Sequence, residues 1–191
     1  MLVLVWEDDA PIADAELAEA ERLCGEAGGR SEGEGPARRW LSHRHNVSYR
    51  QSPMYAMGGF VDTMEVASPW SRLLPMYHAV HRALSPYVFV MAHFSHAYPD
   101  GASIYFTFAG AAKDDDAALV KYTAAWRAAL VAVIDAGGTL SHPHGVGRSK
   151  APAMRREQGA AIEVVRTLKT LLDPRGIFNP GALIGDAADD L

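Results

Sequence analysis

Hydrophobic residues recur along the chain at two kinds of spacing, which predict helices and strands respectively. Spacings of three, four and seven residues are typical of amphipathic helices, and they predict helices at 11–27, 69–84, 114–136 and 162–172. Short runs rich in β-branched and aromatic residues predict strands at 2–6, 60–66, 87–98 and 102–110. A shorter turn of helix is expected at 37–41. The fold is therefore expected to contain strands and helices in similar proportion.

Capping and turn residues predict where several of these elements begin and end. Ser68 followed by Pro69 is typical of an N-cap with proline at the first helical position. Three acidic residues at 114–116 suit a helix start, where the helix dipole favours negative charge. The tripeptide PDG at 99–101 predicts a turn that joins the two strands beside it into a hairpin.

The order of the predicted elements indicates the fold class. A strand–helix–strand unit followed by a hairpin and a helix favours an α+β fold, with a mainly antiparallel sheet and helices packed on one face. The chain has no short-period repeat and no internal linker. We therefore expect one domain over residues 1–184, followed by an acidic tail at 185–191 that frays.

Alternation along the last predicted strand separates its two faces. Ile104, Phe106 and Phe108 share one face, which is expected to point at the helices and form core. Ser103, Tyr105 and Thr107 share the other face. This second face is semi-polar, and the pattern suits a surface that covers a cleft as well as one that faces solvent.

Composition and charge exclude several classes of function. The net charge of −5 over 191 residues gives no basic surface for nucleic acid or anionic membrane. The single Cys24 excludes an internal disulfide framework and is typical of a reducing cytoplasm; its place on an apolar helix face indicates a buried structural thiol. No apolar run approaches the roughly 18 residues of a membrane span, and the N-terminus lacks the basic start of a signal peptide.

The eight histidines occur as four close pairs, which raises the question of a metal site. His78 and His81 lie one helical turn apart but lack an HExxH pattern, so surface or half-buried histidines are the favoured interpretation. His93 and His96 are separated by an odd number of residues and should face opposite sides of a regular strand.

One further close pair, besides His43 and His45, lies in the loop GGTLSHPHGVGRSKAP at 137–152, which is too rich in Gly and Pro for a helix or strand. His142 and His144 flank Pro143 and could point the same way. Loops on a rigid scaffold often carry catalytic groups, although a solvated turn has the same composition. Two imidazoles without a third ligand do not make a metal site, so none is predicted.

Four motifs in order carry a resemblance to a known family: DTMEVASPW, SHAYPDGASIYFTF, GGTLSHPHGVGRSK and LLDPRGIFNPG. With them the chain resembles the C-terminal substrate, or cap, domain of FAD-linked oxidases of the vanillyl-alcohol oxidase superfamily. The nearest branch is that of the alkyldihydroxyacetonephosphate synthases, which make ether lipids. The resemblance extends from Met1 to about Ile184 and implies the α+β fold of that domain.

The resemblance implies an FAD cofactor held mainly by a separate N-terminal domain, absent from this chain. No GxGxxG or GxxxxGK[ST] phosphate-binding motif is present, which fits that expectation. The implied partners are an FAD-binding domain, in the same chain or a neighbouring one, and a small-molecule substrate. The resemblance also allows a homodimer, and it predicts that the isolated chain is inactive.

The resemblance also assigns roles to individual residues. Tyr105 takes the position of the family's catalytic tyrosine, an acid/base beside the flavin. His142 and His144 match the outer members of a triple-histidine loop that serves catalysis and contacts the cofactor, while Pro143 replaces the middle imidazole. Related D-lactate and D-2-hydroxyglutarate dehydrogenases place a metal-binding glutamate in this loop, which is missing here. Arg50 lies near the place of the arginine that anchors the substrate's phosphate.

Two alternatives from other classes stay open beside this one. The first is a stand-alone metal-dependent enzyme that uses the clustered histidines. The second is a non-catalytic binding module. Flavin absorbance or an adjacent FAD-binding domain would favour the oxidase interpretation, and metal analysis would test the metal enzyme.

Overall fold

The computed structural model describes residues 2–46, 51–142 and 144–185. The chain divides into two compact units, Met1–Ser52 and Pro53–Leu191. Arg50, Pro143 and the tail beyond residue 185 lie outside the described residues.

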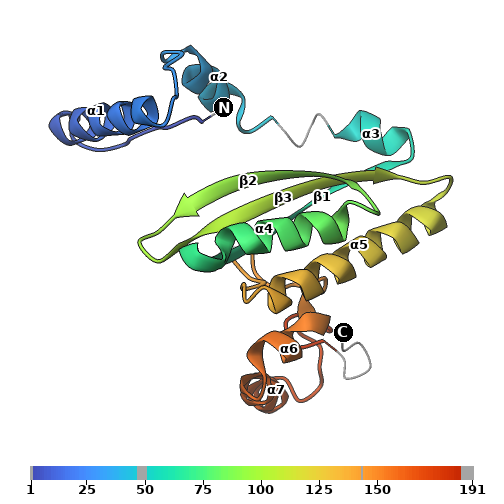
Figure 1. The fold of residues 1–191 in the computed structure, drawn as a ribbon. Helices are drawn as coiled ribbons and strands as arrows, with labels where there is room; N and C mark the ends of the chain where they lie inside the picture. The colour runs from blue at the N-terminus through green and yellow to red at the C-terminus, as the bar shows by residue number, and fades with distance from the viewer. Residues whose placement is uncertain (1, 47–50, 143, 186–191) are drawn as a thin grey trace. The chain divides into compact units, whose positions relative to one another are not determined.

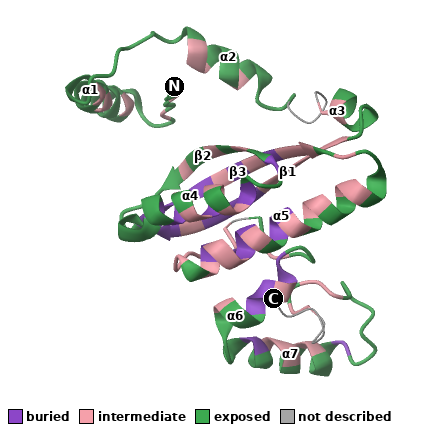
Figure 2. Cartoon of the chain, turned by 45° about the vertical axis from the view of Figure 1, so that its right-hand side comes forward, coloured by how far each residue is buried: buried purple, intermediate pink, exposed green. Residues whose placement is uncertain are grey.

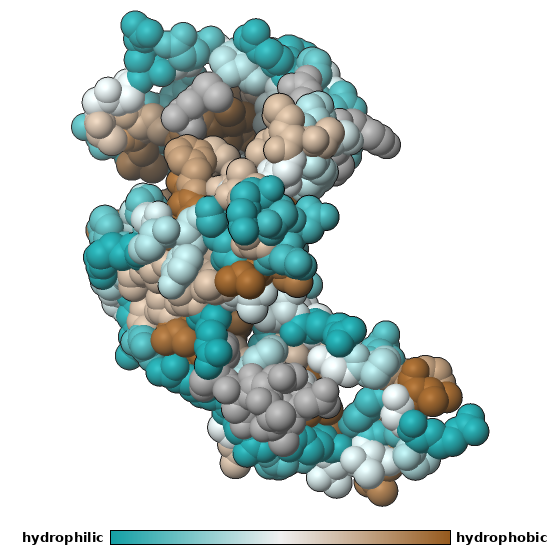
Figure 3. Space-filling model, turned by 90° about the vertical axis from the view of Figure 1, so that its right-hand side faces the viewer, coloured by the Kyte–Doolittle hydropathy of each residue, from teal (hydrophilic) through white to brown (hydrophobic). Residues whose placement is uncertain are grey.

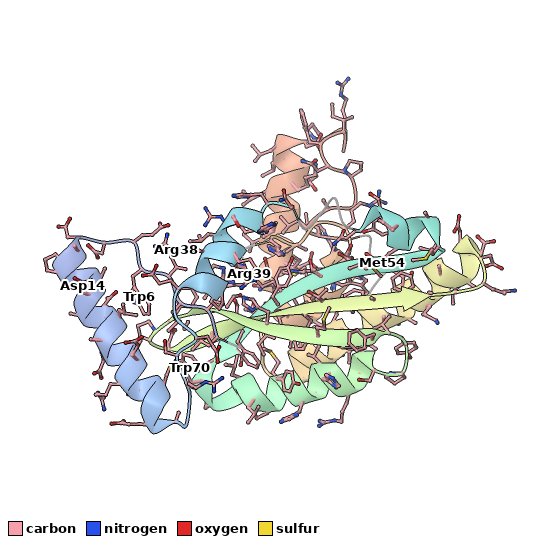
Figure 4. The ribbon with its side chains drawn as sticks, turned by 90° about the horizontal axis from the view of Figure 1, so that it is seen from above. Trp6, Asp14, Arg38, Arg39, Met54 and Trp70 are labelled. Carbon is pink, nitrogen blue, oxygen red and sulfur yellow. The ribbon has the colours of Figure 1, made fainter. Side chains whose placement is uncertain are left out.

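The first unit contains two helices, α1 (Ala10–Glu26) and α2 (Gly35–His43), drawn in blue in Figure 1. Pro11 lies in the first turn of α1, as predicted, and α2 is longer than the predicted turn. Arg38 and Arg39 project from α2 (Figure 4), and Arg38 pairs with Glu34 at 2.6 Å. Neither helix has a buried residue, and Figure 2 draws both in green and pink without purple.

The strand predicted at 2–6 is wrong, because these residues are irregular in the structure. Leu2, Leu4 and Val5 are all exposed. The described part of this unit contains no other strand, so the segment has no partner for its backbone N–H and C=O groups. A β-branched run is therefore insufficient for a strand where a partner is lacking.

The second unit is an α+β fold around an antiparallel sheet, as predicted. Its strands are β1 (Gly59–Pro69), β2 (Phe89–Ala97) and β3 (Gly101–Ala111), in the order β1-β3-β2. Helices α4 (Trp70–Leu84) and α5 (Asp115–Asp135) lie along one face of this sheet (Figure 1). The remaining elements are α3 (Ser52–Ala56), the 3-10 turn η2 (Ala151–Ala153), α6 (Met154–Gln158) and α7 (Ala161–Leu172).

The core lies between the sheet and the two long helices. Ile104, Phe106 and Phe108 of β3 are each 0% exposed, which confirms the face predicted for them. They belong to one cluster with Met76 and Val80 of α4 and with residues of α5. Figure 2 shows this buried layer in purple along the sheet and the helices beneath it. The opposite face of the sheet is left free of both helices.

Helix α5 is long and apolar enough to cross a membrane by length and composition, contrary to the expectation that no segment is. In the structure it packs on α4 and the sheet instead, and it buries Ala125, Trp126, Ala129, Leu130 and Val133. This packing accounts for its high mean hydropathy. It begins among the three acidic residues, as predicted, and the Asp114 carboxylate also caps it by accepting a hydrogen bond from the Ala117 N–H at 2.8 Å.

The start of α4 differs from the prediction. Ser68 is not an N-cap, because β1 continues through Pro69 and the helix begins at Trp70. Pairing of Ser68 with Ala102 and of Pro69 with Gly101 keeps both residues extended. Trp70 (labelled in Figure 4) then ties the helix to the hairpin turn, since its indole N–H donates to the Tyr98 carbonyl at 3.0 Å.

Candidate active site

The face of the sheet opposite α4 and α5, called the helix-free face with respect to these two helices, carries the chemistry-bearing side chains. Glu65 of β1 lies directly opposite Tyr105 of β3, which in turn lies opposite His93 of β2. Residues opposite one another in antiparallel strands project to the same face, so these three form one row across the sheet. Ser103 and Ser95 form part of the next row. The semi-polar face predicted for Tyr105 is therefore the face that holds the candidate site.

The histidine loop reaches this face because it is attached to β1 just after α5 ends. Ala67 and Thr139 exchange two backbone hydrogen bonds, of 3.2 and 2.8 Å between N and O. This close approach requires glycine at position 138: a Cβ there would lie 3.1 Å from the Ala67 carbonyl oxygen and 2.3 Å from the Met76 sulfur. Leu140, one residue beyond the bridge, is 0% exposed and anchors the loop in the core.

Glu65 is the centre on which the loop and the sheet converge. Its side chain is only 2% exposed, and its Oε1 lies 2.9 Å from the Ser103 hydroxyl and 3.3 Å from that of Ser95. Its Oε2 lies 3.2 Å from Nε2 of His144, and Oε1 lies 3.6 Å from Nδ1 of His142. The site is thus built around a buried carboxylate.

The structure brings Tyr105 and His144 together. Their ring centroids are 5.3 Å apart, with the rings perpendicular to each other. Tyr105 is half-buried, and 42% of the His144 side chain is exposed. A phenol and an imidazole in contact, open to solvent on one side, can move a proton to or from a bound molecule.

His142 takes a different position from His144. Its ring lies 5.6 Å from that of Tyr98 and 5.7 Å from that of His96, centroid to centroid. Its Nδ1 is buried and has no hydrogen-bond partner among the described residues. The two predicted imidazoles therefore share the carboxylate, but His144 is the one in ring contact with Tyr105.

The expectation that His93 and His96 face opposite sides of the sheet is wrong. Strand β2 is irregular between Ser95 and Ala97, and His96 has a φ of +46°. This irregularity turns the His96 ring back onto the site face, where Nε2 lies 3.9 Å from Oε1 of Glu65. Alternation along a strand holds only while the strand stays regular.

A buried lysine lies behind the carboxylate. Lys150 is 4% exposed, and its ammonium donates to the backbone carbonyl of Glu65 at 3.2 Å. Burial lowers the pKa of Lys150, and the Glu65 and Glu157 carboxylates oppose part of that shift. A positive group close to Glu65 reduces the cost of burying its negative charge.

A pocket of about 350 Å³ opens at the end of the hairpin. Its lining includes Ala67 of β1, Thr139 of the loop and Tyr98, whose ring also contacts His142. Small residues such as Gly101 and Ala102 form another part of the wall. The pocket therefore borders Tyr98, the aromatic neighbour of His142.

Sequence reasoning found Tyr105 and the two loop histidines but missed Glu65, His96 and Lys150. Glu65 did leave a signal, because it is an acidic residue between the apolar Met64 and Val66 within the predicted strand. His96 left none, since an irregularity in a strand cannot be read from its alternation. Within the described part of the chain, no three or more His, Cys, Asp or Glu side chains are arranged to hold a metal ion.

The comparisons with known proteins point to one family. The profile of "FAD linked oxidases, C-terminal domain" matches residues 1–183. Alkyldihydroxyacetonephosphate synthase of Dictyostelium discoideum is 28% identical over 80% of this chain and 26% of its own length. The synthase of Trypanosoma brucei brucei is 24% identical over 78% of this chain and 25% of its own length.

A solved structure of an alkyldihydroxyacetonephosphate synthase has the same fold. It superposes with a TM-score of 0.59 over 89% of this chain and 29% of that protein, at 21% identity. The chain thus spans about a quarter of the length of the curated relatives named above. With the profile match over nearly its whole length, the chain belongs to the family of C-terminal domains of FAD-linked oxidases.

Proposed function

We propose that this chain is the substrate-handling domain of an FAD-dependent enzyme of the alkyldihydroxyacetonephosphate synthase type. The observation that carries the proposal is the contact between Tyr105 and His144 on the helix-free face of the sheet. The similarity to the synthases supports the same assignment.

The residues of the site fit the reactive end of a flavin. Phenol and imidazole groups on an open sheet face suit the polar edge of an isoalloxazine ring, and His142 and His144 would contact it. The chain contains no GxGxxG or GxxxxGK[ST] motif to cradle the phosphates of the cofactor. A separate FAD-binding domain would therefore hold most of the cofactor, which when bound would supply the redox-active centre.

The chain's own residues would manage protons on the substrate. Tyr105 would give or take a proton at the reacting carbon or oxygen, and His144 would exchange that proton with the phenol. Such a step requires an imidazole in reach of the phenol, because a free phenol is a weak base in neutral water. Arg50 is the proposed anchor for a substrate phosphate, by resemblance alone.

The proposal is tested with the chain joined to an FAD-binding domain from a related synthase, with the isolated chain as the control. The joined protein is offered an acyl-dihydroxyacetonephosphate with a fatty alcohol, or a small 2-hydroxy acid. Product from the first pair supports the synthase assignment. Product from the second alone would replace that assignment with oxidation of a hydroxy substrate, and no product from either would contradict the proposal.

Pro143 gives a more specific prediction for the same joined protein. Proline has no side-chain donor or acceptor, so the loop lacks one imidazole of the family's three. We therefore expect Pro143→His to raise turnover of the acyl-dihydroxyacetonephosphate. Unchanged turnover in this variant would show that the middle position of the loop does not contribute.

A further inference from the structure

Glu65 is a carboxylate buried almost completely, at a position where an apolar side chain would avoid the cost of burying a charge. Its side chain is 2% exposed, and burying a charged group is costly unless hydrogen bonds and opposite charges compensate. Here the compensation comes from three elements. The hydroxyls belong to β2 and β3, two imidazoles belong to the loop after α5, and the Lys150 ammonium lies near the end of that loop. So much convergence on one carboxylate suggests a function beyond packing.

The two oxygens of Glu65 have different partners. Oε1 is the oxygen approached by the Ser103 and Ser95 hydroxyls, at 2.9 and 3.3 Å. Oε2 has the His144 Nε2 at 3.2 Å. The Ser95 and Ser103 hydroxyls lie on Oε1, where the single Ser103 proton is shared with the Ser95 carbonyl at 2.9 Å, and Oε2 is left to the imidazole. This division explains why the buried Nδ1 of His142, 3.6 Å from Oε1, finds no hydrogen-bond partner among the described residues.

From this arrangement we propose that Glu65 is a positioning residue that keeps the neutral His144 imidazole protonated on Nε2. A carboxylate accepts hydrogen bonds only, so the ring nitrogen that faces it must carry the proton. Nδ1 of His144 is then the acceptor nitrogen of the ring that contacts Tyr105. A buried carboxylate thereby fixes the tautomer of His144. In this tautomer the neutral ring accepts a proton on Nδ1, so in the proposed exchange it takes the proton from the Tyr105 phenol.

The titratable groups around Glu65 come from every element that packs against it. They are His96 of β2, Tyr105 of β3, His142 and His144 of the loop, and Lys150. His96 and His142 lie at 3.9 and 3.6 Å from Oε1, beyond hydrogen-bond distance. His144 is therefore the histidine that Glu65 is best placed to orient.

The tautomer is measured directly by long-range ¹H–¹⁵N NMR on the full chain with ¹⁵N-labelled histidine. We expect His144 to be predominantly in the Nε2–H form at a pH where it is neutral. Glu65→Gln, which replaces a charge-assisted hydrogen bond by a neutral one, should lower the ratio of the two tautomers about tenfold. Glu65→Asp should preserve part of the preference, and Glu163→Gln, which removes an exposed carboxylate paired with Arg155, should leave it unchanged.

A second variant keeps the test decisive if Glu65→Gln does not fold. Ser103→Ala removes one hydroxyl from Oε1 and retains the carboxylate. We expect the freed lone pair to recruit Nδ1 of His142, so the His142 signals shift toward the Nδ1–H form while those of His144 stay. A His144 that is an equal mixture of tautomers in the unaltered chain, or predominantly Nδ1–H, would overturn the proposal.

The catalytic consequence rests on the proposed function and is measured separately. In the protein joined to an FAD-binding domain, Glu65→Gln should lower kcat about tenfold or more with KM little changed, and Glu65→Asp should recover part of kcat. Equal kcat in Glu65→Gln and the unaltered joined protein would remove the catalytic role. A joined protein without turnover would contradict the proposed function, whereas the tautomer measurement would still decide the position of the proton.

Discussion

Two carboxylates of β1 lie on opposite faces of the sheet and bind different partners. Asp62 faces the helices, where its Oδ2 accepts hydrogen bonds from the Tyr122 hydroxyl at 2.5 Å and the Trp126 indole N–H at 3.1 Å. Glu65 faces the histidine loop. The first carboxylate joins the sheet to α5, and the second organises the candidate site. At the residue scale, one acidic side chain of β1 thus stabilises the packing of the sheet on a helix, and the other positions the side chains of the candidate site.

The Asp62 contact predicts a late-titrating tyrosine. Burial, followed by the hydrogen bond to the Asp62 carboxylate and its charge, raises the pKa of Tyr122 to about 12. In a titration followed by ultraviolet absorbance, Tyr122 should therefore ionise about two pH units above the usual value for a tyrosine. Asp62→Asn should lower that pKa but leave it above 10, since burial persists, and Tyr122→Phe should remove the late step.

The sign of the effect on stability follows from the direction of the shift. Between about pH 10 and 12 the unfolded chain loses the Tyr122 proton while the folded chain retains it. The free energy of unfolding should therefore fall across this window and be unaffected by Tyr122 below it. A shallower fall in Tyr122→Phe than in the unaltered chain would support this account, and an identical fall would contradict it.

At the element scale, the sequence predicted the longer helices and the strands of the second unit. The helices at α4, α5 and α7 and the hairpin of β2 and β3 were found because each carries a regular apolar pattern. The short helices α3 and α6 were missed, since five residues are too few for a periodic pattern. The site was predicted in part for the same reason: Tyr105 lies on a regular strand, whereas His96 depends on an irregular one.

Helix α7 shows that an apolar pattern can predict a helix without predicting whether its apolar side chains are buried. Ile162 is 2% exposed, but Val164, Leu168 and Leu172 are exposed at 62, 52 and 81%. Figure 3 likewise shows brown hydrophobic groups at the surface of the molecule among polar ones. Periodicity reports which side chains share a side of the helix, and burial depends on what else packs there.

The register of β3 gives a prediction for the core. Phe106 is 0% exposed between the sheet and α4, where its ring stacks on Tyr77 at 6.2 Å between centroids. Phe106→Ala should lower the free energy of unfolding by about 3–5 kcal/mol in urea denaturation, because it leaves a cavity. Phe89→Ala, at a β2 side chain that is 68% exposed, is the matched control and should change it by less than about 0.5 kcal/mol. Equal losses in the two variants would contradict the assigned faces of the sheet.

At the scale of the whole molecule, the chain has the fold of one domain of longer proteins. It matches about a quarter of the length of two synthases, and a TM-score of 0.59 relates its fold to a solved synthase structure. The described residues of the candidate site belong to the second unit and lie on a sheet face that neither α4 nor α5 covers (Figure 1).

The contribution of Tyr105 to turnover is the measurement that tests the central claim most directly. The chain joined to an FAD-binding domain is compared with its Tyr105→Phe variant, and Tyr87→Phe, at an exposed tyrosine before β2, serves as control. Loss of the phenol should lower turnover of an acyl-dihydroxyacetonephosphate about 10²–10⁴-fold, the usual contribution of a general acid or base, with bound flavin and folding unchanged. Turnover of the Tyr105→Phe protein equal to that of the Tyr87→Phe control would contradict the account.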